Sequence, residues 1–316
     1  MINKRRVAIV GAGAVGASTA YALALNGACG EIILYDIVSD IAIGKAIDIA
    51  QSTNYSPRGT VVRSIVNPEE MVNCDIVVVT AGVPRKKDMT RADLLNINAN
   101  IVKDVSLNIK KYSPNAIIIC VSNPLDVMNF VIQKITGWDR SRIIGMSGAL
   151  DGSRMAYQIY KKLGFGASQI KAMVIGEHGQ NMIPYPEISD VAGVPLTKLL
   201  SKNDIDDIIQ KTKDGGAEIV KYLKTSAFYA PARAIAVMVE AILNDEDKII
   251  SSSVILDGEY GYRGVSISIP IVLGRSGVKK IIELDLDEPT REKFDLAVES
   301  IKNGISILEN SNFFNK

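Results

Sequence analysis

The sequence has few of the residues that mark secreted, metal-binding or membrane-spanning proteins. In 316 residues it contains three cysteines, Cys29, Cys74 and Cys120, and one histidine. The cysteines are odd in number and form no CxxC pair, so we expect buried free thiols, a reducing cytoplasmic environment and no metal site. The polar first residues lead directly into the run 7–10, which predicts no signal peptide. Apolar runs such as 116–121 are far too short to cross a bilayer, so no membrane partner is expected.

The chain also lacks an excess of charge of either sign. It has 36 basic and 35 acidic residues, which gives a formal net charge of +1. A nucleic-acid-binding protein would show a basic patch or stripe, so we expect no nucleic-acid partner. Hydrophobic residues make up 47% of the chain, an ordinary globular composition. Any selectivity for anions therefore has to come from local arginines.

The first half of the chain alternates short β-branched runs with helical patterns. The runs Val7–Val10, Ile32–Tyr35 and Ile117–Val121 predict strands, and Ala14–Leu25 predicts a helix between the first two. Near-continuous apolar strands are typical of a parallel sheet that is covered by helices on both faces. The sequence therefore predicts an α/β fold that begins with a Rossmann-type, doubly wound parallel sheet.

The second half of the chain loses this regular alternation. Gln169–Ile175 and Lys248–Leu256 have strand composition, whereas Asp204–Leu223 has a long helical pattern. Strands and helices that do not alternate are typical of an α+β domain. We therefore expect a Rossmann domain over residues 1–147 and an α+β catalytic domain over residues 148–316, packed closely together.

A glycine-rich turn follows the first predicted strand. It consists of Gly11, Ala12, Gly13, Ala14, Val15 and Gly16. This is GxGxxG between a strand and a helix, where Gly11 permits the tight turn, Gly13 lets the backbone approach a pyrophosphate and Gly16 lets the helix pack closely. Asp36 ends the second predicted strand 20 residues after Gly16, where a carboxylate accepts hydrogen bonds from ribose hydroxyls and repels a 2′-phosphate. A glycine turn and a surface aspartate are each unremarkable alone, but together they predict NAD as the cofactor.

The only histidine, His178, lies between Glu177 and Gly179 after a predicted strand. A lone histidine is more often structural than catalytic. Its unperturbed pKa is nevertheless the one suited to proton exchange near neutrality. Asp151 and Arg154 lie three residues apart in a predicted helix and so share one helix face, where a surface ion pair is the simplest interpretation.

Two further polar segments follow predicted strands of the first half. The segment 85–91 follows the run Ile76–Thr80, and Asn123-Pro124 follows the run that ends at Val121. Their simplest interpretations are a solvated loop and a helix cap. Because both lie at the carboxyl ends of parallel strands, they are also candidates for a ligand crevice, the first of them as a lid.

Taken together, these segments resemble the lactate/malate dehydrogenase family, and within it the malate branch that is similar to lactate dehydrogenases. The matching segments are Gly11–Gly16, Thr80–Lys86, Thr90-Arg91, Val121–Pro124, Asp151–Arg154 and His178-Gly179. They occur in the family's order and spacing, and the resemblance covers essentially the whole chain. It implies a reversible, NAD-dependent oxidation of (S)-malate, a small dicarboxylate, to oxaloacetate, a reaction of the tricarboxylic acid cycle.

The resemblance also implies a role for each candidate residue. His178 would exchange the hydroxyl proton, and Asp151 would orient and stabilise its imidazole. The substrate would be held by Arg85, Arg91, Asn123 and Arg154. Arg91 would polarise the carbonyl oxygen, and Arg85 would meet the second carboxylate, where lactate dehydrogenases typically carry glutamine. Beyond the glycine-rich turn and Asp36, cofactor contacts would come from Asn98, Val121, Ser122 and Asn123.

Some residues depart from the malate branch. Glu177 stands where malate enzymes often have glycine and lactate enzymes often have glutamate, and Lys86-Lys87-Asp88 stands where the branch commonly has Lys-Pro-Gly. An L-lactate or other 2-hydroxyacid dehydrogenase is therefore the alternative enzyme, and a non-catalytic NAD-binding regulator is the alternative from another class. Such a regulator would need only the glycine-rich turn and Asp36. The resemblance further implies a homo-oligomer, with a tetramer favoured over a dimer.

Overall fold

A parallel sheet forms the centre of the first half of the chain. The computed structural model describes residues 5–55, 59–84 and 89–315. The parallel strands are β1 (Arg6–Val10), β2 (Glu31–Tyr35), β3 (Val61–Ile65), β4 (Ile76–Val79), β5 (Ile117–Cys120) and β6 (Ile143–Gly145). Their spatial order is β3-β2-β1-β4-β5-β6, which is the doubly wound order of a Rossmann fold. The predicted fold class of this half is confirmed.

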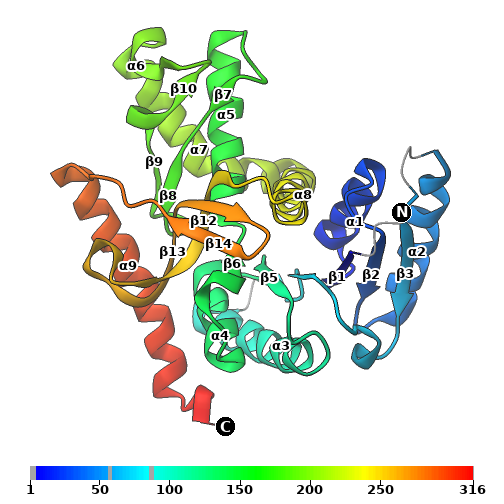
Figure 1. The fold of residues 1–316 in the computed structure, drawn as a ribbon. Coiled ribbons are helices and arrows are strands. Elements are labelled where there is room, and N and C mark those ends of the chain that lie inside the picture. Colours follow the sequence, from blue (N-terminus) through cyan, green and yellow to red (C-terminus); the bar gives the residue numbers. More distant parts are fainter. Residues whose placement is uncertain (1–4, 56–58, 85–88, 316) are drawn as a thin grey trace.

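Four long helices cover this sheet (Figure 1). They are α1 (Ala14–Asn26), α2 (Ser39–Ser52), α3 (Arg91–Tyr112) and α4 (Leu125–Thr136). α1 packs on α2, and α3 packs on α4, so the two pairs form separate layers. Every residue of β4 and β5 is buried, which explains why these strands read as continuous apolar runs.

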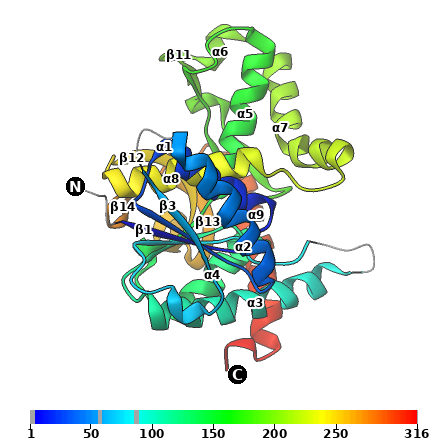
Figure 2. The same ribbon diagram turned by 90° about the vertical axis from the view of Figure 1, so that its right-hand side faces the viewer.

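The second half of the chain combines antiparallel strands with helices. Its helices are α5 (Ser147–Leu163), α6 (Leu196–Leu199), α7 (Lys202–Leu223), α8 (Tyr229–Asn244) and α9 (Glu288–Asn310). Its longer strands are β12 (Lys248–Asp257), β13 (Arg263–Gly274) and β14 (Gly277–Ile281), and its shorter ones are β7 (Ile170–Lys171), β8 (Val174–Gly176), β9 (Met182–Pro184), β10 (Asp190–Val191) and β11 (Val194–Pro195). Helices α5 and α7 pack together and rise from the sheet, as both views show (Figure 2). The predicted α+β character is confirmed.

One sheet runs through both halves of the chain. Strand β6 pairs with β12 through Gly145 and Ser253, and the order then continues through β13, β8 and β9. A Cβ atom at Gly145 would lie 2.8 Å from the Cβ of Ser253, so glycine is what permits this close approach. The end of the parallel sheet is thereby fixed against the second half.

The predicted strand Gln169–Ile175 is wrong as a single element. Ile170–Lys171 belongs to a small sheet with β10 and β11, whereas Val174–Gly176 belongs to the large sheet. The chain passes from one sheet to the other at Met173, whose N–H donates to Ser189 Oγ at 3.1 Å instead of to a neighbouring strand. Local composition could not reveal this change of partner. Among the described residues, no helix combines the length and apolar character needed to span a membrane.

Candidate active site

The glycine-rich turn between β1 and α1 has the shape that the sequence predicts. Gly11 has φ 103°, and a Cβ atom there would lie 2.6 Å from Thr80 Oγ1. A Cβ atom at Gly16 would overlap the carbonyl oxygen of Gly11, so only glycine lets α1 begin so close to β1. A Cβ atom at Gly13 would meet nothing within 4 Å. The turn therefore packs tightly at Gly11 and Gly16 and leaves room at Gly13 for a ligand such as a pyrophosphate.

Asp36 holds this turn from the end of β2. Its Oδ2 accepts a hydrogen bond from the Ala12 N–H at 2.7 Å, and its Oδ1 accepts one from the Val38 N–H at 3.0 Å. A carboxylate has about four acceptor positions, so two remain for ribose hydroxyls. The residues at this edge of the sheet fit the adenosine end of NAD.

Buried polar side chains join the loops that follow β4 and β5. The Asn98 amide, 2% exposed, accepts from the Val83 N–H at 2.9 Å and donates to the Asn123 carbonyl at 2.7 Å. The Ser122 hydroxyl donates to the Ala81 carbonyl at 2.5 Å. In the structure Asn98 and Ser122 thus tie the two loops together, and their predicted contacts with the cofactor stay predictions. Val121, half-buried, and the exposed side chain of Asn123 lie in the same place.

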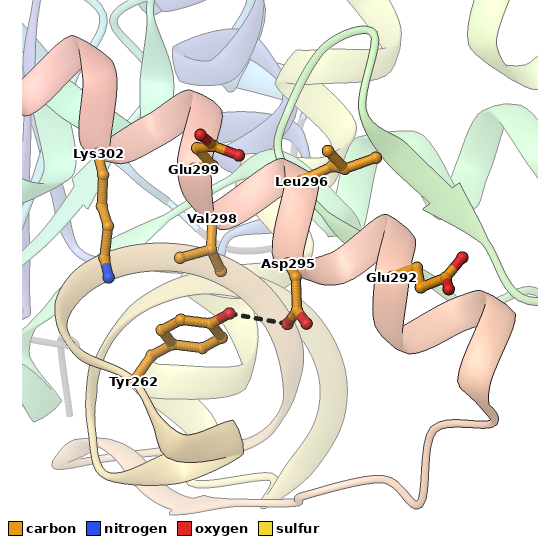
Figure 3. Close-up of a pocket in the computed structure, with 7 residues that line it drawn as sticks. All are labelled: Tyr262, Glu292, Asp295, Leu296, Val298, Glu299 and Lys302. Carbon is orange, nitrogen blue, oxygen red and sulfur yellow. Dashed lines mark hydrogen bonds between the residues drawn. The ribbon is translucent and has the colours of Figure 1, made fainter.

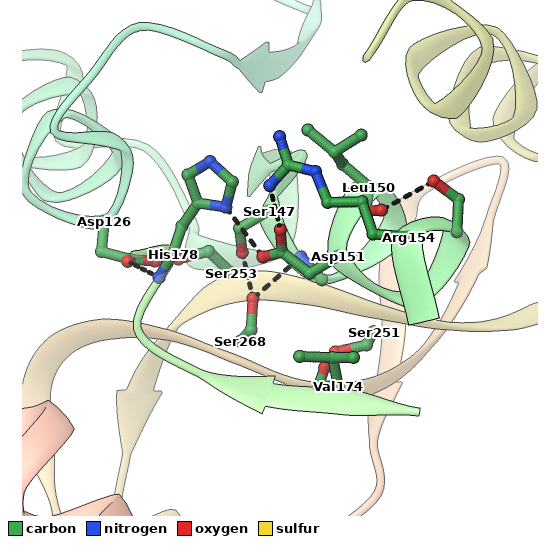
Figure 4. Close-up of polar contacts among 12 residues, drawn as sticks. Asp126, Ser147, Leu150, Asp151, Arg154, Val174, His178, Ser251, Ser253 and Ser268 are labelled. Atoms are coloured by element: carbon green, nitrogen blue, oxygen red, sulfur yellow. Dashed lines mark hydrogen bonds and ion pairs between the residues drawn. The ribbon is translucent and has the colours of Figure 1, made fainter. Parts of the chain in front are cut away.

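Three of the predicted residues come together in one cluster (Figure 4). His178, between β8 and β9, has its Nδ1 atom 2.8 Å from Asp151 Oδ2, and an Nη1 donor of Arg154 lies 3.0 Å from Asp151 Oδ1. Asp151 and Arg154 stand one turn apart on α5, so the helix presents both to the histidine. Asp151 is 2% exposed, and its carboxylate contacts two half-buried groups, the His178 ring and the Arg154 guanidinium. The surface ion pair, the simplest interpretation of the sequence, is therefore wrong.

The contact with Asp151 determines which ring nitrogen of neutral His178 carries the proton. An ionised carboxylate only accepts hydrogen bonds, so the proton lies on Nδ1 and the Nε2 atom of the neutral ring is the free base. Burial alone would lower the pKa of His178, but the negative charge of Asp151, its hydrogen bond and the charge of Asp126 together raise the pKa above the usual 6.5. The histidine therefore holds a proton more firmly than a free imidazole does.

The side chain of Arg154 holds a buried hydrogen-bond donor. Its Nε atom is buried, and it finds no hydrogen-bond partner within the described ranges. Gly215 and Gly216 of α7 lie against this side chain, where a Cβ atom at Gly216 would come within 3.5 Å of the guanidinium. A buried unpaired donor on a cation is costly unless a ligand supplies an acceptor. An anion such as a carboxylate would satisfy it.

The sequence analysis missed Asp126, which contacts the same cluster. Its Oδ2 accepts a hydrogen bond from the His178 N–H at 2.8 Å, and its Oδ1 accepts one from Ser253 Oγ at 2.5 Å. Asp126 is 3% exposed, and burial raises its pKa to about 6 against the lowering effect of these hydrogen bonds. The available signal was a single acid within the otherwise apolar run Leu125–Met128.

The structure does not bring every predicted residue to this cluster. Arg91 is the first residue of α3 and is exposed, and within the described ranges no hydrogen bond joins it to His178, Asp151 or Arg154. Arg85 lies outside the described residues. No group of three or more histidine, cysteine, aspartate or glutamate side chains in the described part of the chain could hold a metal ion.

A hollow beside α9 is separate from these residues (Figure 3). Tyr262 donates from its hydroxyl to Asp295 at 2.8 Å, and Lys302 Nζ lies 4.8 Å from the centre of the Tyr262 ring. Three polar residues that line this hollow thus contact one another, and none of the predicted site residues lines it. It is not a candidate for the chemistry.

Two models of known protein families match the chain. The lactate/malate dehydrogenase NAD-binding domain matches residues 5–145, and the lactate/malate dehydrogenase alpha/beta C-terminal domain matches residues 148–311. The prediction that the first half binds NAD is thereby confirmed.

Relatives and solved structures agree with these matches. The malate dehydrogenase of Sulfurimonas denitrificans is 51% identical over 100% of this chain and 99% of its own length. The solved apo structure of malate dehydrogenase from Picrophilus torridus is 38% identical, with a TM-score of 0.95 and 99% of both chains covered. A lactate dehydrogenase of Cryptosporidium parvum, solved with lactic acid and nicotinamide adenine dinucleotide, is 34% identical, with a TM-score of 0.93 over 98% of this chain and 99% of that one. The chain therefore belongs to the lactate/malate dehydrogenase family.

Proposed function

We propose that this protein catalyses the reversible oxidation of (S)-malate to oxaloacetate with NAD. The observation that carries the proposal is the cluster of His178, Asp151 and Arg154, in which one base is oriented by a buried acid beside an arginine with an unpaired donor. Relatives named malate dehydrogenase, 51% and 47% identical over nearly the whole chain, support the same substrate.

His178 serves as the acid and base of the reaction. In the direction of oxidation, the free Nε2 atom of the neutral ring accepts the proton of the substrate hydroxyl. Asp151 keeps the Nδ1 proton in place and stabilises the imidazolium that forms. In the direction of reduction, the same imidazolium returns the proton. Bound NAD supplies the acceptor of the hydride that leaves the substrate carbon.

Arginines recognise the dianionic substrate. Arg154 pairs with the carboxylate beside the reacting carbon, because its buried Nε atom is a donor with no partner among the described residues. Arg91 polarises the carbonyl oxygen and Asn123 donates a hydrogen bond to the substrate. Arg85 pairs with the second carboxylate, a role that rests on its charge and on the resemblance of its segment to the malate branch.

The cofactor is held at the carboxyl edge of the parallel sheet. Residues Gly11–Gly16 take the pyrophosphate and Asp36 takes the ribose hydroxyls, which excludes a 2′-phosphate by charge. Asn98, Val121 and Ser122 complete the cofactor site. The open space at Gly13 and the remaining acceptor capacity of Asp36 support these assignments.

Initial rates with NADH against oxaloacetate and pyruvate test the choice of substrate. We expect a strong preference for oxaloacetate, because pyruvate leaves the Arg85 charge without a partner. Removing one side of a buried ion pair costs about 3–5 kcal/mol, which corresponds to about two to four powers of ten in kcat/KM. Arg85→Gln should lose about this factor with oxaloacetate and gain activity with pyruvate, while Arg91→Gln should lower both alike.

An L-lactate or other 2-hydroxyacid dehydrogenase is the second candidate. Glu177 favours it, and the structure holds this side chain in place with hydrogen bonds from Asn181 at 2.6 Å and Ser300 at 3.0 Å. Equal efficiency with pyruvate and oxaloacetate in the same assay would replace the malate proposal with this one. Equal effects of Arg85→Gln on both substrates would place the discriminating contact elsewhere.

We further propose the organisation in which this reaction takes place. Residues 1–147 form the cofactor domain and residues 148–316 the catalytic domain, in a cytoplasmic homo-oligomer, a tetramer in preference to a dimer, that serves the tricarboxylic acid cycle. Exposed apolar side chains on α1 and α2, such as Tyr21, Ile41 and Ile47, support self-association. Light scattering after gel filtration measures the number of subunits.

A further inference from the structure

A line of buried polar groups connects three elements to the backbone of His178. The Asn129 amide donates to Ser266 Oγ at 2.9 Å, and the hydroxyls of Ser266 and Ser253 lie 2.8 Å apart. Ser253 Oγ then donates to Asp126 Oδ1, and Asp126 Oδ2 accepts the His178 N–H. These bonds join α4, β12 and β13 to the loop that carries the histidine, and Figure 4 shows the part from Ser253 to His178.

Filling a protein core with polar side chains is energetically unfavourable compared with filling it with apolar ones. Asp126, Asn129, Ser253 and Ser266 are each at most 3% exposed. Burying a carboxylate is unfavourable unless hydrogen bonds compensate, and apolar residues of similar size would fill the same space without that cost. The one feature that sets the line apart from simple core filling is its end point, the N–H of the single histidine.

We propose that Asp126 is a positioning residue for the reaction, which fixes the backbone of His178 and places a second negative charge next to this residue. Asp151 holds the imidazole through Nδ1, and Asp126 holds the same residue through its backbone N–H, so His178 is fixed both at its ring and at its backbone. The inference rests on the proposed role of His178 as acid and base. In this proposal Asp126 acts through the histidine alone, without a contact of its own to substrate or cofactor.

The charges that face His178 come from two helices and from its own loop. Asp151 and Arg154 lie on α5, Asp126 lies on α4, and Glu177 precedes the histidine. The Asp126 charge supports the imidazolium together with Asp151, while Arg154 opposes it. Removing the charge of Asp126 alone is therefore expected to move the proton affinity of His178 downward.

Two substitutions at Asp126 separate its geometry from its charge. Asp126→Ala leaves the His178 N–H without its acceptor. We expect kcat to fall by about 10- to 100-fold with an unchanged KM for NADH, because a small misplacement of a catalytic group lowers the rate by factors of this order. Asp126→Asn can still accept from the His178 N–H and donate to Ser253, so kcat should stay within about threefold at its own optimum pH. Because the negative charge is lost, His178 should lose its proton more easily, and the rising limb of the pH–rate profile of malate oxidation should move to lower pH.

A matched pair on β12 keeps the test valid if Asp126→Ala fails to fold. Ser253→Ala removes the hydroxyl that supports Asp126 and should lower kcat by about two- to tenfold, the effect of one net hydrogen bond. Ser251→Ala removes a buried hydroxyl that donates to the Val174 carbonyl at 2.5 Å, and it should leave kcat unchanged. Thermal unfolding of every variant shows whether a change in rate reflects loss of folded protein.

The possible outcomes separate this inference from the proposed function. His178→Gln should lower turnover by about 10²–10⁴-fold, and near-normal turnover there would remove the acid–base role itself. If His178→Gln is inactive but folded Asp126→Ala turns over normally, only the positioning role is wrong. A pH profile that stays in place in Asp126→Asn, or equal effects of Ser253→Ala and Ser251→Ala, would also overturn it.

Discussion

Replacing Asp151 by asparagine removes one charge from the centre of the site and changes almost no volume. The carboxylate accepts from His178 Nδ1 at 2.8 Å and from Arg154 at 3.0 Å, and it is buried. An asparagine offers one acceptor oxygen where the structure requires two. Either the imidazole or the guanidinium therefore faces an amide NH₂ group, and neither retains a neighbouring negative charge from this position.

The expected loss follows from these contacts. A hydrogen bond to a charged group contributes about 1.5–3 kcal/mol, and unit charges about 4 Å apart near a protein surface attract by about 4 kcal/mol. Arg154 competes for the same carboxylate, so we take about 3–4 kcal/mol as the support that the imidazolium loses. This corresponds to about 10²–10³-fold in kcat/KM for oxaloacetate reduction near pH 8. Because the equilibrium constant of the reaction is fixed, malate oxidation should fall by the same factor at that pH if cofactor affinity is unchanged.

The assay measures kcat/KM from initial rates of NADH absorbance change between pH 6 and 10 for the wild type and Asp151→Asn. The carboxylate raises the pKa of His178, so its loss should move the rising limb of malate oxidation to lower pH. Asp207→Asn is the matched control, because it removes a carboxylate from an exposed 2.7 Å ion pair with Lys211. Activity of Asp151→Asn within threefold of the wild type, with an unmoved pH profile, would refute the role of Asp151.

Four further substitutions test the glycine-rich turn, Asp36 and Asp126. Gly16→Ala should lower the free energy of unfolding by about 1–3 kcal/mol in thermal unfolding, because the added Cβ atom overlaps the Gly11 carbonyl. Gly13→Ala should unfold like the wild type but raise KM for NADH roughly tenfold, a loss of about 1.4 kcal/mol in binding free energy. Asp36→Ala should narrow the preference for NADH over NADPH in kcat/KM, and an unchanged ratio would remove the assignment of Asp36. Burial raises the pKa of Asp126 to about 6 from the usual 3.8, so the free energy of unfolding of the wild type falls by about 3 kcal/mol as the pH rises through this range. In urea unfolding, Asp126→Asn should therefore be more stable than the wild type at pH 8 and as stable as the wild type at pH 3.

Most of the parallel sheet could be predicted from the sequence because its strands are buried on both faces. The predicted strand Ile32–Tyr35 and helix Ala14–Leu25 each differ from the observed elements by one residue at one end. Helix α2 was not predicted, since it buries only Ala42, Ala46 and Ile49 and exposes isoleucines between them. A face made of small residues gives little periodic signal.

Within the candidate site, too, some contacts could be predicted from the sequence and others could not. Asp151 and Arg154 are three residues apart, so their contact follows from helical geometry. The bond from His178 to Asp126 spans 52 residues, and that from Ser253 to Asp126 spans 127. Contacts at such separations depend on the tertiary fold and leave no local pattern. An acid within an apolar helix start was the one visible trace.

The shared sheet has a consequence for attempts to produce the two halves as fragments. A chain that ended near Ser147 would leave β6 as an open sheet edge, and the complementary fragment would expose the edge of β12 that Gly145 covers. Helix α4 would also lose its contacts with β12, β13 and α9. Unpaired apolar edges promote intermolecular strand pairing. Each fragment alone should therefore aggregate, and co-expression of the two should be needed to recover soluble material.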